Sequence, residues 1–212
     1  MVITPRFGQC IAAIAGAVAL AATPAAAQTP LFPAGVSQAN LDCLFGLQCT
    51  VAPHDEANDI PLPGISGKAV LQSRLLAAKD GSRADGRTLY QYRVDLSAAT
   101  TLVDSSCITN LTVKFGPVAK LPYAAGTVLR DVYEIQQDIP ATQIGFASAV
   151  QTGEFVTFTF AKAICASDGS GPGDTSRAFG LASVDGPARG VQVLMDSPGL
   201  DDLRTKSFGP RR

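Results

Sequence analysis

From Gly67 onward, turn-forming residues recur at short intervals, and this spacing constrains the fold more than any other feature of the chain. The runs between the turns are short and apolar or alternating, which is typical of strands joined by tight turns. No run keeps a helical period convincingly over three turns, so a parallel sheet covered by helices is not favoured. The sequence therefore predicts an all-β domain. Turns are expected at 79–82, Pro117, Pro122, Gly126, Asp138 with Pro140, Gly153 and the glycine-rich segment 168–174.

Three segments alternate apolar and polar residues, as a strand with one buried face does. They are 88–96, 107–115 and 154–165. In the second segment, Cys107 has the parity of the apolar residues, so we expect it to point into the core. In the third segment, Cys165 has the parity opposite to that of the apolar residues Val156, Phe158, Phe160 and Ile164.

Five weaker candidates bring the predicted strands to about eight. Eight short strands favour an antiparallel two-sheet β-sandwich, which we expect to span residues 67–196. For residues 69–78 a helix is the alternative, because good helix formers cluster there. The weaker strand candidates are 68–76, 128–135, 144–150, 177–184 and 190–195.

Residues 1–27 have the composition of an export signal peptide. Arg6 supplies one positive charge, residues 11–22 form a short apolar run, and the three alanines at 25–27 fit the small-x-small cleavage rule. The mature chain is expected to begin at Gln28 and to be periplasmic or secreted. No later stretch reaches the roughly 18 consecutive apolar residues of a membrane span, so a membrane-spanning protein is not expected.

The segments on either side of the sandwich are expected to be less regular. Residues 28–66 form a proline-rich, irregular N-terminal leader, because proline excludes long helices and confines strands to short or edge pieces. Residues 197–212 mix proline, glycine and charges, which predicts a loose tail. The prolines of the leader are Pro30, Pro33, Pro53, Pro61 and Pro63.

Four cysteines follow the signal segment, and an even number in an exported chain predicts two disulfides. Three pairings are open. We favour Cys43 with Cys49 and Cys107 with Cys165, because the first pair closes a short loop at little entropic cost. The parity of Cys165 means that the second bridge requires a bulge or a strand that ends near Ala163.

Little catalytic chemistry is available to the chain. It has one histidine, which excludes metal centres with several histidines, and its cysteines lack the paired C-x2-C spacing of zinc sites, so we expect no metal site of this kind. His54 is the only candidate imidazole base, and its acidic surroundings predict an exposed loop side chain. Two close carboxylate pairs could serve a glycoside hydrolase, namely Asp131 with Glu134 and Asp55 with Glu56.

Two groups of side chains are candidates for ligand contacts. Oxygen ligands spaced along the segment 168–174 predict a calcium site at Asp168, Ser170 and Asp174, although the EF-hand order and its terminal glutamate are missing. A plain glycine-rich turn is the alternative. In the absence of tryptophan, four tyrosines could stack on sugar rings, although tyrosines at alternating strand positions also pack into cores. These tyrosines are Tyr90, Tyr92, Tyr123 and Tyr133.

Three strand-and-turn segments resemble stretches of exported bacterial surface proteins of the PEP-CTERM-associated kind. The segments are 110–117, 156–160 and 173–183, and the resemblance covers residues 86–183. Proteins of that kind end with a Pro-Glu-Pro signal, an apolar helix and a basic tail, whereas this chain lacks the sorting segment and shares only two terminal arginines with that ending. The resemblance therefore implies neither membrane sorting nor any functional residue.

The balance of charge also limits the partners. Of 17 Lys and Arg residues only Arg6 lies in the signal segment, which contains none of the 18 acidic residues, so the mature chain carries a small negative charge and nucleic acid is not expected as a partner. We expect an exported, non-catalytic sandwich that binds an unidentified cell-surface or extracellular partner or has a structural role. A carbohydrate or small-ligand binding module and a carboxylate-pair glycoside hydrolase are the alternatives.

Overall fold

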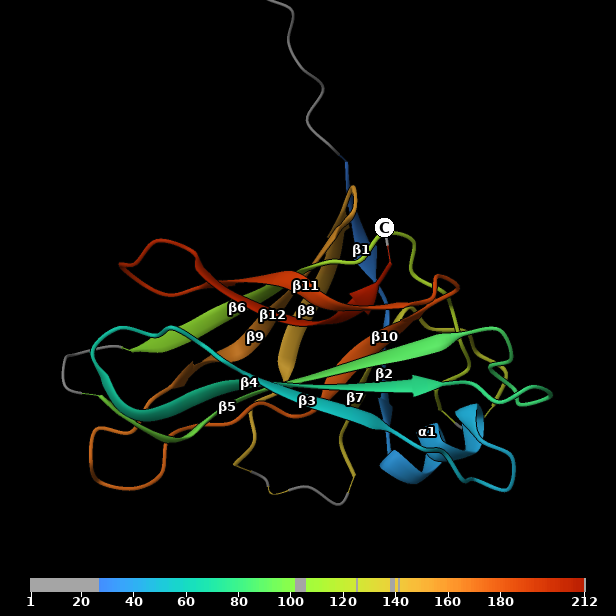
Figure 1. The fold of residues 1–212 in the computed structure, drawn as a ribbon, viewed down its shortest axis with the longest axis horizontal. Helices are drawn as coiled ribbons and strands as arrows, with labels where there is room; N and C mark the ends of the chain where they lie inside the picture. The colour runs from blue at the N-terminus through green and yellow to red at the C-terminus, as the bar shows by residue number, and fades with distance from the viewer. Residues whose placement is uncertain (1–26, 102–105, 125, 138–139, 141, 212) are drawn as a thin grey trace, which may run out of the picture.

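The computed structural model describes residues 27–101, 106–124, 126–137, 140 and 142–211. Within these ranges, twelve strands form two six-stranded sheets, and a single short helix lies outside the sheets (Figure 1). The protein is thus an all-β sandwich, as the sequence predicts. All but the last residue of the predicted signal segment lie outside the described residues. No helix among the described residues has the length and apolar character needed to cross a membrane.

The first sheet, sheet A, is antiparallel throughout. Four of its strands lie late in the chain, but the first strand of the described residues forms one edge. In spatial order the strands are β1 (Gln28–Leu31), β8 (Phe146–Thr152), β9 (Phe155–Cys165), β6 (Cys107–Lys114), β11 (Pro187–Asp196) and β12 (Leu203–Pro210).

The second sheet, sheet B, contains the long central hairpin of the fold. Its pairs are antiparallel except that β2 runs parallel to β7. In spatial order the strands are β2 (Pro33–Val36), β7 (Val132–Ile135), β10 (Phe179–Ser183), β5 (Thr88–Thr101), β4 (Ile65–Ala77) and β3 (His54–Asp59).

The main core lies between the inner faces of the two sheets. Phe179 of sheet B is at its centre, with its ring centroid 4.7 Å from that of Phe158 on β9 and 6.2 Å from that of Tyr92 on β5. The residues that each strand contributes to this core occupy alternate positions, as Phe179 and Leu181 do on β10. Aromatic contacts of this kind add specific packing energy to the burial of apolar area.

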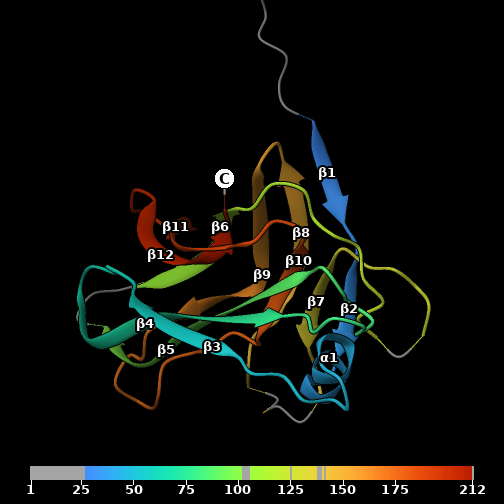
Figure 2. The same ribbon diagram turned by 45° about the vertical axis from the view of Figure 1, so that its right-hand side comes forward.

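A second, smaller core lies on the outer face of sheet B, beneath the helix α1 (Gln38–Phe45). Leu41, Leu44 and Phe45 of α1 are buried there against side chains that include Leu76 and Tyr133 of sheet B. Ser37 caps the helix by accepting a hydrogen bond from the Asn40 backbone N–H at 3.2 Å. The helix thus covers one end of the outer face of sheet B (Figure 2).

The leader and the tail are more regular than the sequence predicts. Residues 28–66 contain three strands and α1, and the prolines of β1 and β2 are tolerated because both are edge strands. Residues 203–210 form β12, which pairs with β11 and buries Leu203 and Phe208. The expectation of a loose tail is therefore wrong, because this segment completes sheet A.

All eight predicted strands are present in the structure, and residues 69–78 lie almost wholly in β4 rather than in a helix. Both predicted disulfides, Cys43–Cys49 and Cys107–Cys165, are also confirmed. The predicted inward orientation of Cys107 is wrong. Its neighbour Ile108 is buried in the core, so Cys107 and its register partner Cys165 point to the outer face of sheet A.

A bulge explains this error. The register of β6 against β9 shifts between Ile108 and Asn110, where β9 has extra residues. The shift reverses the parity of β6, so Ile108 and Leu111 face the same core although they are three positions apart. The bulge that the parity of Cys165 requires is thus present, and it brings the cysteines together outside the core.

Candidate functional site

An open cavity of about 660 Å³ lies on the outer face of sheet B, beside α1. Strands β3, β4 and β5 form its floor, and the first turn of α1 forms one wall. Residues that follow β7 and precede β8, among them Gln137 and Gln143, line another part of the wall. The cavity exists because α1 covers only one end of the sheet and leaves the adjacent strand surface open.

The floor is polar because of strand alternation. On β4 and β5 the inward residues belong to the main core, so Gln72, Arg74, Gln91 and Arg93 point outward. The register places Arg74 opposite Gln91 and Gln72 opposite Arg93. Asp55 of β3 lies opposite Arg74 on the other side. The sequence therefore builds one polar row across three strands and an adjacent polar row across β4 and β5.

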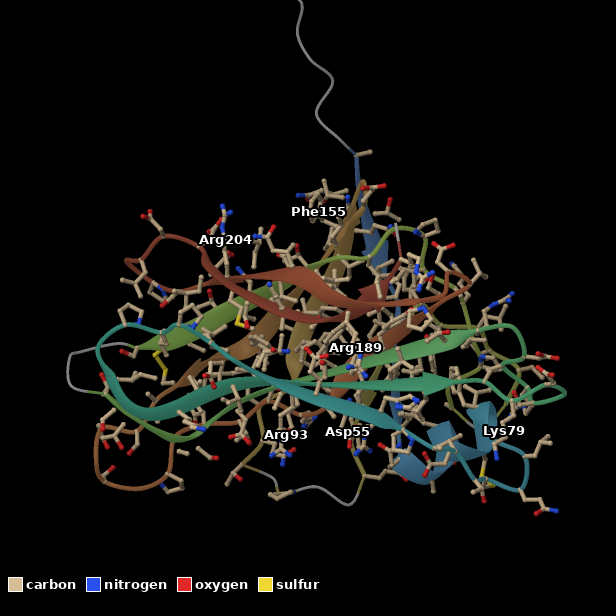
Figure 3. The ribbon with its side chains drawn as sticks, in the orientation of Figure 1. Asp55, Lys79, Arg93, Phe155, Arg189 and Arg204 are labelled. Carbon is tan, nitrogen blue, oxygen red and sulfur yellow. A yellow bond between two sulfur atoms is a disulfide. The ribbon has the colours of Figure 1, made fainter. Side chains whose placement is uncertain are left out.

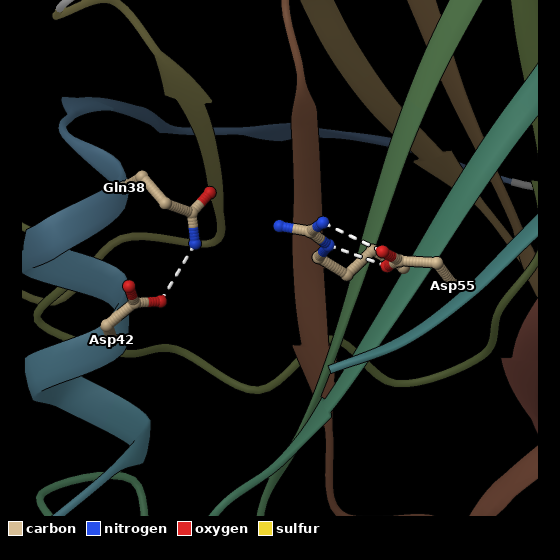
Figure 4. A network of polar contacts seen from close by, with 4 residues as sticks. Gln38, Asp42 and Asp55 are labelled. Carbon is tan, nitrogen blue, oxygen red and sulfur yellow. Dashed lines mark hydrogen bonds and ion pairs between the residues drawn. The ribbon is translucent and has the colours of Figure 1, made fainter. Parts of the chain in front are cut away.

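Asp55 and Arg74 form a bidentate ion pair at one side of the cavity. Arg74 donates from Nε to Asp55 Oδ1 at 2.7 Å and from Nη2 to Oδ2 at 2.8 Å (Figure 4). The hydrogen bond from Arg74 lowers the pKa of the Asp55 carboxyl, which keeps it ionised. The same contact raises the pKa of Arg74. These two charges therefore neutralise each other without a ligand.

The opposite wall is held by a contact within α1. Gln38 Nε2 donates to Asp42 Oδ1 at 2.9 Å, one helical turn away. Figure 4 shows this pair on α1 across from Asp55. The negative charge of Asp42 is close enough to contribute to the raised pKa of Arg74. Gln38 is thereby fixed at the rim of the cavity.

Two polar atoms beneath the cavity have no partner among the described residues. They are Oε1 of Gln91, a residue only 6% exposed, and Nε of Arg93. Arg93 forms no ion pair or side-chain hydrogen bond with any described residue. A buried polar atom without a partner typically costs about 1–3 kcal/mol. Among the described lining residues, Gln91 and Arg93 thus hold the buried polar atoms that lack a partner.

The acidic residue nearest to Arg93 along β5 is already engaged. Asp95 accepts a hydrogen bond from Gln72 Nε2 at 3.1 Å and another from the Ser97 backbone N–H at 3.0 Å. Asp55 is occupied by Arg74. Arg93 therefore has no direct ion-pair partner among the described residues. Figure 3 shows Asp55 and Arg93 on the same side of sheet B, facing away from sheet A.

The predicted histidine and the carboxylate pairs do not form a common catalytic centre in the structure. His54 is exposed at the start of β3, and Asp55 and Glu56 point to opposite faces of that strand. Asp131 accepts from the Phe32 backbone N–H and pairs with Lys120, whereas Glu134 accepts from Phe146, Gln136 and Arg177. Each carboxylate thus has its own structural partners.

The predicted calcium ligands make separate contacts within their loop. Asp168 Oδ1 accepts from the Ser170 backbone N–H at 2.9 Å, and contacts with Ser170 lower the pKa of Asp168. Asp174 Oδ2 instead accepts from the Cys165 backbone N–H at 3.1 Å. No cluster of three acidic, histidine or cysteine side chains suited to a metal occurs among the described residues. These contacts stabilise a turn.

The predicted role of the tyrosines in ligand stacking requires correction. Tyr90, Tyr92, Tyr123 and Tyr133 are each at most 1% exposed, and their rings lie in the two cores. A ring that protein atoms cover on both faces has no face left for a sugar. Burial also raises the pKa of each hydroxyl well above its ordinary value.

The cavity itself was not identified from the sequence, although one signal was present. The strand pattern of 88–96 places Gln91 and Arg93 on its solvent face. What the pattern lacks is the position of α1, which makes part of that face concave. No family model, curated protein or solved structure matches this chain, and the resemblance to PEP-CTERM-associated surface proteins remains a prediction.

Proposed function

We propose that this chain is an exported, non-catalytic β-sandwich protein that binds a small polar ligand in the cavity beside α1. The observation that carries the proposal is the pair of unpartnered polar atoms, Gln91 Oε1 and Arg93 Nε, beneath a cavity of about 660 Å³. A cavity of this size suits a small molecule, and binding sites typically combine apolar walls with a few convergent polar groups.

A binding role is favoured over hydrolysis by the state of the acidic groups. A glycoside hydrolase needs one protonated and one ionised carboxyl facing the same bond. Asp55 is held ionised by Arg74, and Glu56 points to the other face of β3. His54 does not line the cavity. Among the described residues, the cavity therefore offers groups that hold a ligand and no carboxyl pair suited to cleave it.

The two disulfides support an oxidising compartment, which is the periplasm or the extracellular medium. Together with the composition of residues 1–27, they favour export of the chain. A periplasmic or secreted protein with an open polar cavity is suited to capture a solute.

The proposal is tested by ligand screening with a blocked cavity. Ala57, which is exposed and lines the cavity, is replaced by Phe, and Ala161, exposed on β9 of the other sheet, is replaced by Phe as a matched control. A library of small polar compounds is screened by the shift in melting temperature. We expect a compound that stabilises the wild type and Ala161→Phe but not Ala57→Phe. The proposal fails if no compound stabilises the wild type, or if Ala57→Phe responds equally.

A further inference from the structure

We propose that the ligand of this cavity is an acidic sugar whose carboxylate binds Arg93 and whose hydroxyl group donates to Gln91. This inference rests on the proposed function and specifies the ligand class. It follows from the two groups that the protein leaves unpaired and from the side chains around them.

The carboxylate is inferred from Arg93. A guanidinium group donates in a planar fork that matches the two oxygens of a carboxylate. Arg74 already uses its fork on Asp55, with Nε and Nη2 both engaged. The fork of Arg93 has no such partner among the described residues, and its Nε is buried. A carboxylate on the ligand would complete the second ion pair of the cavity.

The hydroxyl group is inferred from Gln91. The unpartnered atom of this side chain is the acceptor Oε1, so the ligand must supply a donor. Neither this atom nor Arg93 Nε is exposed to solvent, so each terminal group must turn to meet the ligand. This rotation of the two side chains is favourable because the ligand supplies hydrogen-bond partners that the protein does not.

The spacing of the two groups fits one sugar residue. Gln91 and Arg93 are two positions apart on the same face of β5, which places their Cβ atoms about 7 Å apart. In a hexuronate, the carboxylate and the ring hydroxyls are separated by the width of one ring. A single residue of the sugar can therefore contact both side chains.

The rest of the lining also suits a sugar. Four further glutamines line the cavity, and an amide can both donate and accept hydrogen bonds, as a hydroxyl group does. These residues are Gln38, Gln72, Gln137 and Gln143. The tyrosines are buried in the cores, so the ionic contact with Arg93 takes the role that stacking has in many sugar sites.

The charge of the cavity favours a carboxylate over a phosphate. Of the two arginines that line the cavity, Arg74 is paired with Asp55, whereas Arg93 has no ion-pair partner among the described residues. A carboxylate introduces one negative charge next to Arg93 and can pair with it directly. A phosphate monoester introduces up to two charges, and the described lining residues offer no second unpaired cation for the second charge.

The test uses trimers of galacturonate and of mannuronate, each with its methyl ester as the neutral match. Binding to the full exported chain is measured by calorimetry for the wild type, Arg93→Gln, Gln91→Leu and the control Arg204→Gln on β12. We expect at least one acid trimer to bind and its ester to bind much more weakly. Arg93→Gln should lower the affinity roughly ten- to hundredfold, and Gln91→Leu should lower it by several fold. Arg204→Gln should have no effect.

Four results would overturn the inference. Equal binding of acid and ester would show that no carboxylate contact is made, and unchanged affinity of Arg93→Gln would show that Arg93 is not its partner. If neither acid trimer binds while another compound binds the wild type but not Ala57→Phe, the ligand class is wrong although the proposed function survives. If no compound binds at all, both proposals fail.

Discussion

Arg74 and Asp55 lie directly opposite each other on β4 and β3 and form two parallel hydrogen bonds of 2.7 and 2.8 Å. Because the pKa of Asp55 is lowered in the folded chain, the stabilisation by this pair is fully present above about pH 4 and is lost as the pH falls through the lowered pKa. Both side chains are partly exposed, so the contribution is at most about 1 kcal/mol.

The corresponding prediction concerns Asp55→Asn. This substitution should lower the free energy of unfolding by less than about 1 kcal/mol at pH 7, and the difference from the wild type should shrink as the pH falls below about 4. Urea unfolding at several pH values measures both effects. A difference that grows on acidification would contradict the assigned sign of the pKa shift.

The bridge between Cys107 and Cys165 should be the more stabilising of the two disulfides. It joins residues 58 positions apart, whereas Cys43 and Cys49 are six apart. In the chain-entropy model the long loop contributes about 4 kcal/mol and the short loop about 2 kcal/mol. Urea unfolding of the two double serine variants compares them. A larger loss on removal of Cys43 and Cys49 would refute this order.

Truncation of a buried side chain in β12 should be costly. Phe208 is 3% exposed and packs in the main core, so Phe208→Ala should lower the free energy of unfolding by about 3–5 kcal/mol. Arg204 is an exposed residue of the same strand, and Arg204→Ala should change it by less than about 0.5 kcal/mol. Similar effects of the two substitutions in chemical denaturation would argue that β12 is not an integral strand.

Replacement of His54 by alanine should change neither the stability of the protein nor its ligand binding appreciably. The residue is exposed at the start of β3 and does not line the cavity, so the expected loss of stability is below about 0.5 kcal/mol. Binding of any ligand found by the screen should also be unchanged. A hundredfold loss of an activity in a folded His54→Ala protein would instead identify a general base, since such groups contribute 10²- to 10⁴-fold.

Exported protein should begin at Gln28. The first strand, β1, starts at this residue, and Gln28 pairs with Thr152. Cleavage after residue 27 therefore leaves the strand intact, whereas cleavage beyond Leu31 would remove it from sheet A. N-terminal sequencing of material from the periplasm or medium checks the site. Recovery of such material with Met1 at its start would contradict signal removal.

The strands that alternation predicts are those with one face in the main core, such as β5, because burial imposes the period of two. Strands β1 and β3 bury few of their residues, so their sequences show no such pattern. Periodicity also fails at Cys107, because an inserted bulge changes the parity without any mark in the sequence.

The polar floor of the cavity could be predicted from the sequence, but the wall formed by α1 could not. Alternation places Gln91 and Arg93 on the outer face of β5, which is correct, but Gln91 is buried there and does not face solvent. The wall of the cavity depends on α1, whose eight residues lie between proline-rich stretches and are held by tertiary contacts. Short helices gain most of their stability from such packing and little from local propensity. The concave shape is therefore a tertiary property.

Strands β1 and β2 come from one extended stretch that crosses from sheet A to sheet B at Phe32. Their partners are far along the chain, since Gln28 pairs with Thr152 and Pro33 with Val132. During synthesis, β1 and β2 are made before their partner strands. They must therefore remain without these partners until more than half of the chain has been made. The hairpin of β4 and β5 can form first, because its contacts are local. The segment that joins the two sheets is thus among the first to emerge and among the last to be secured.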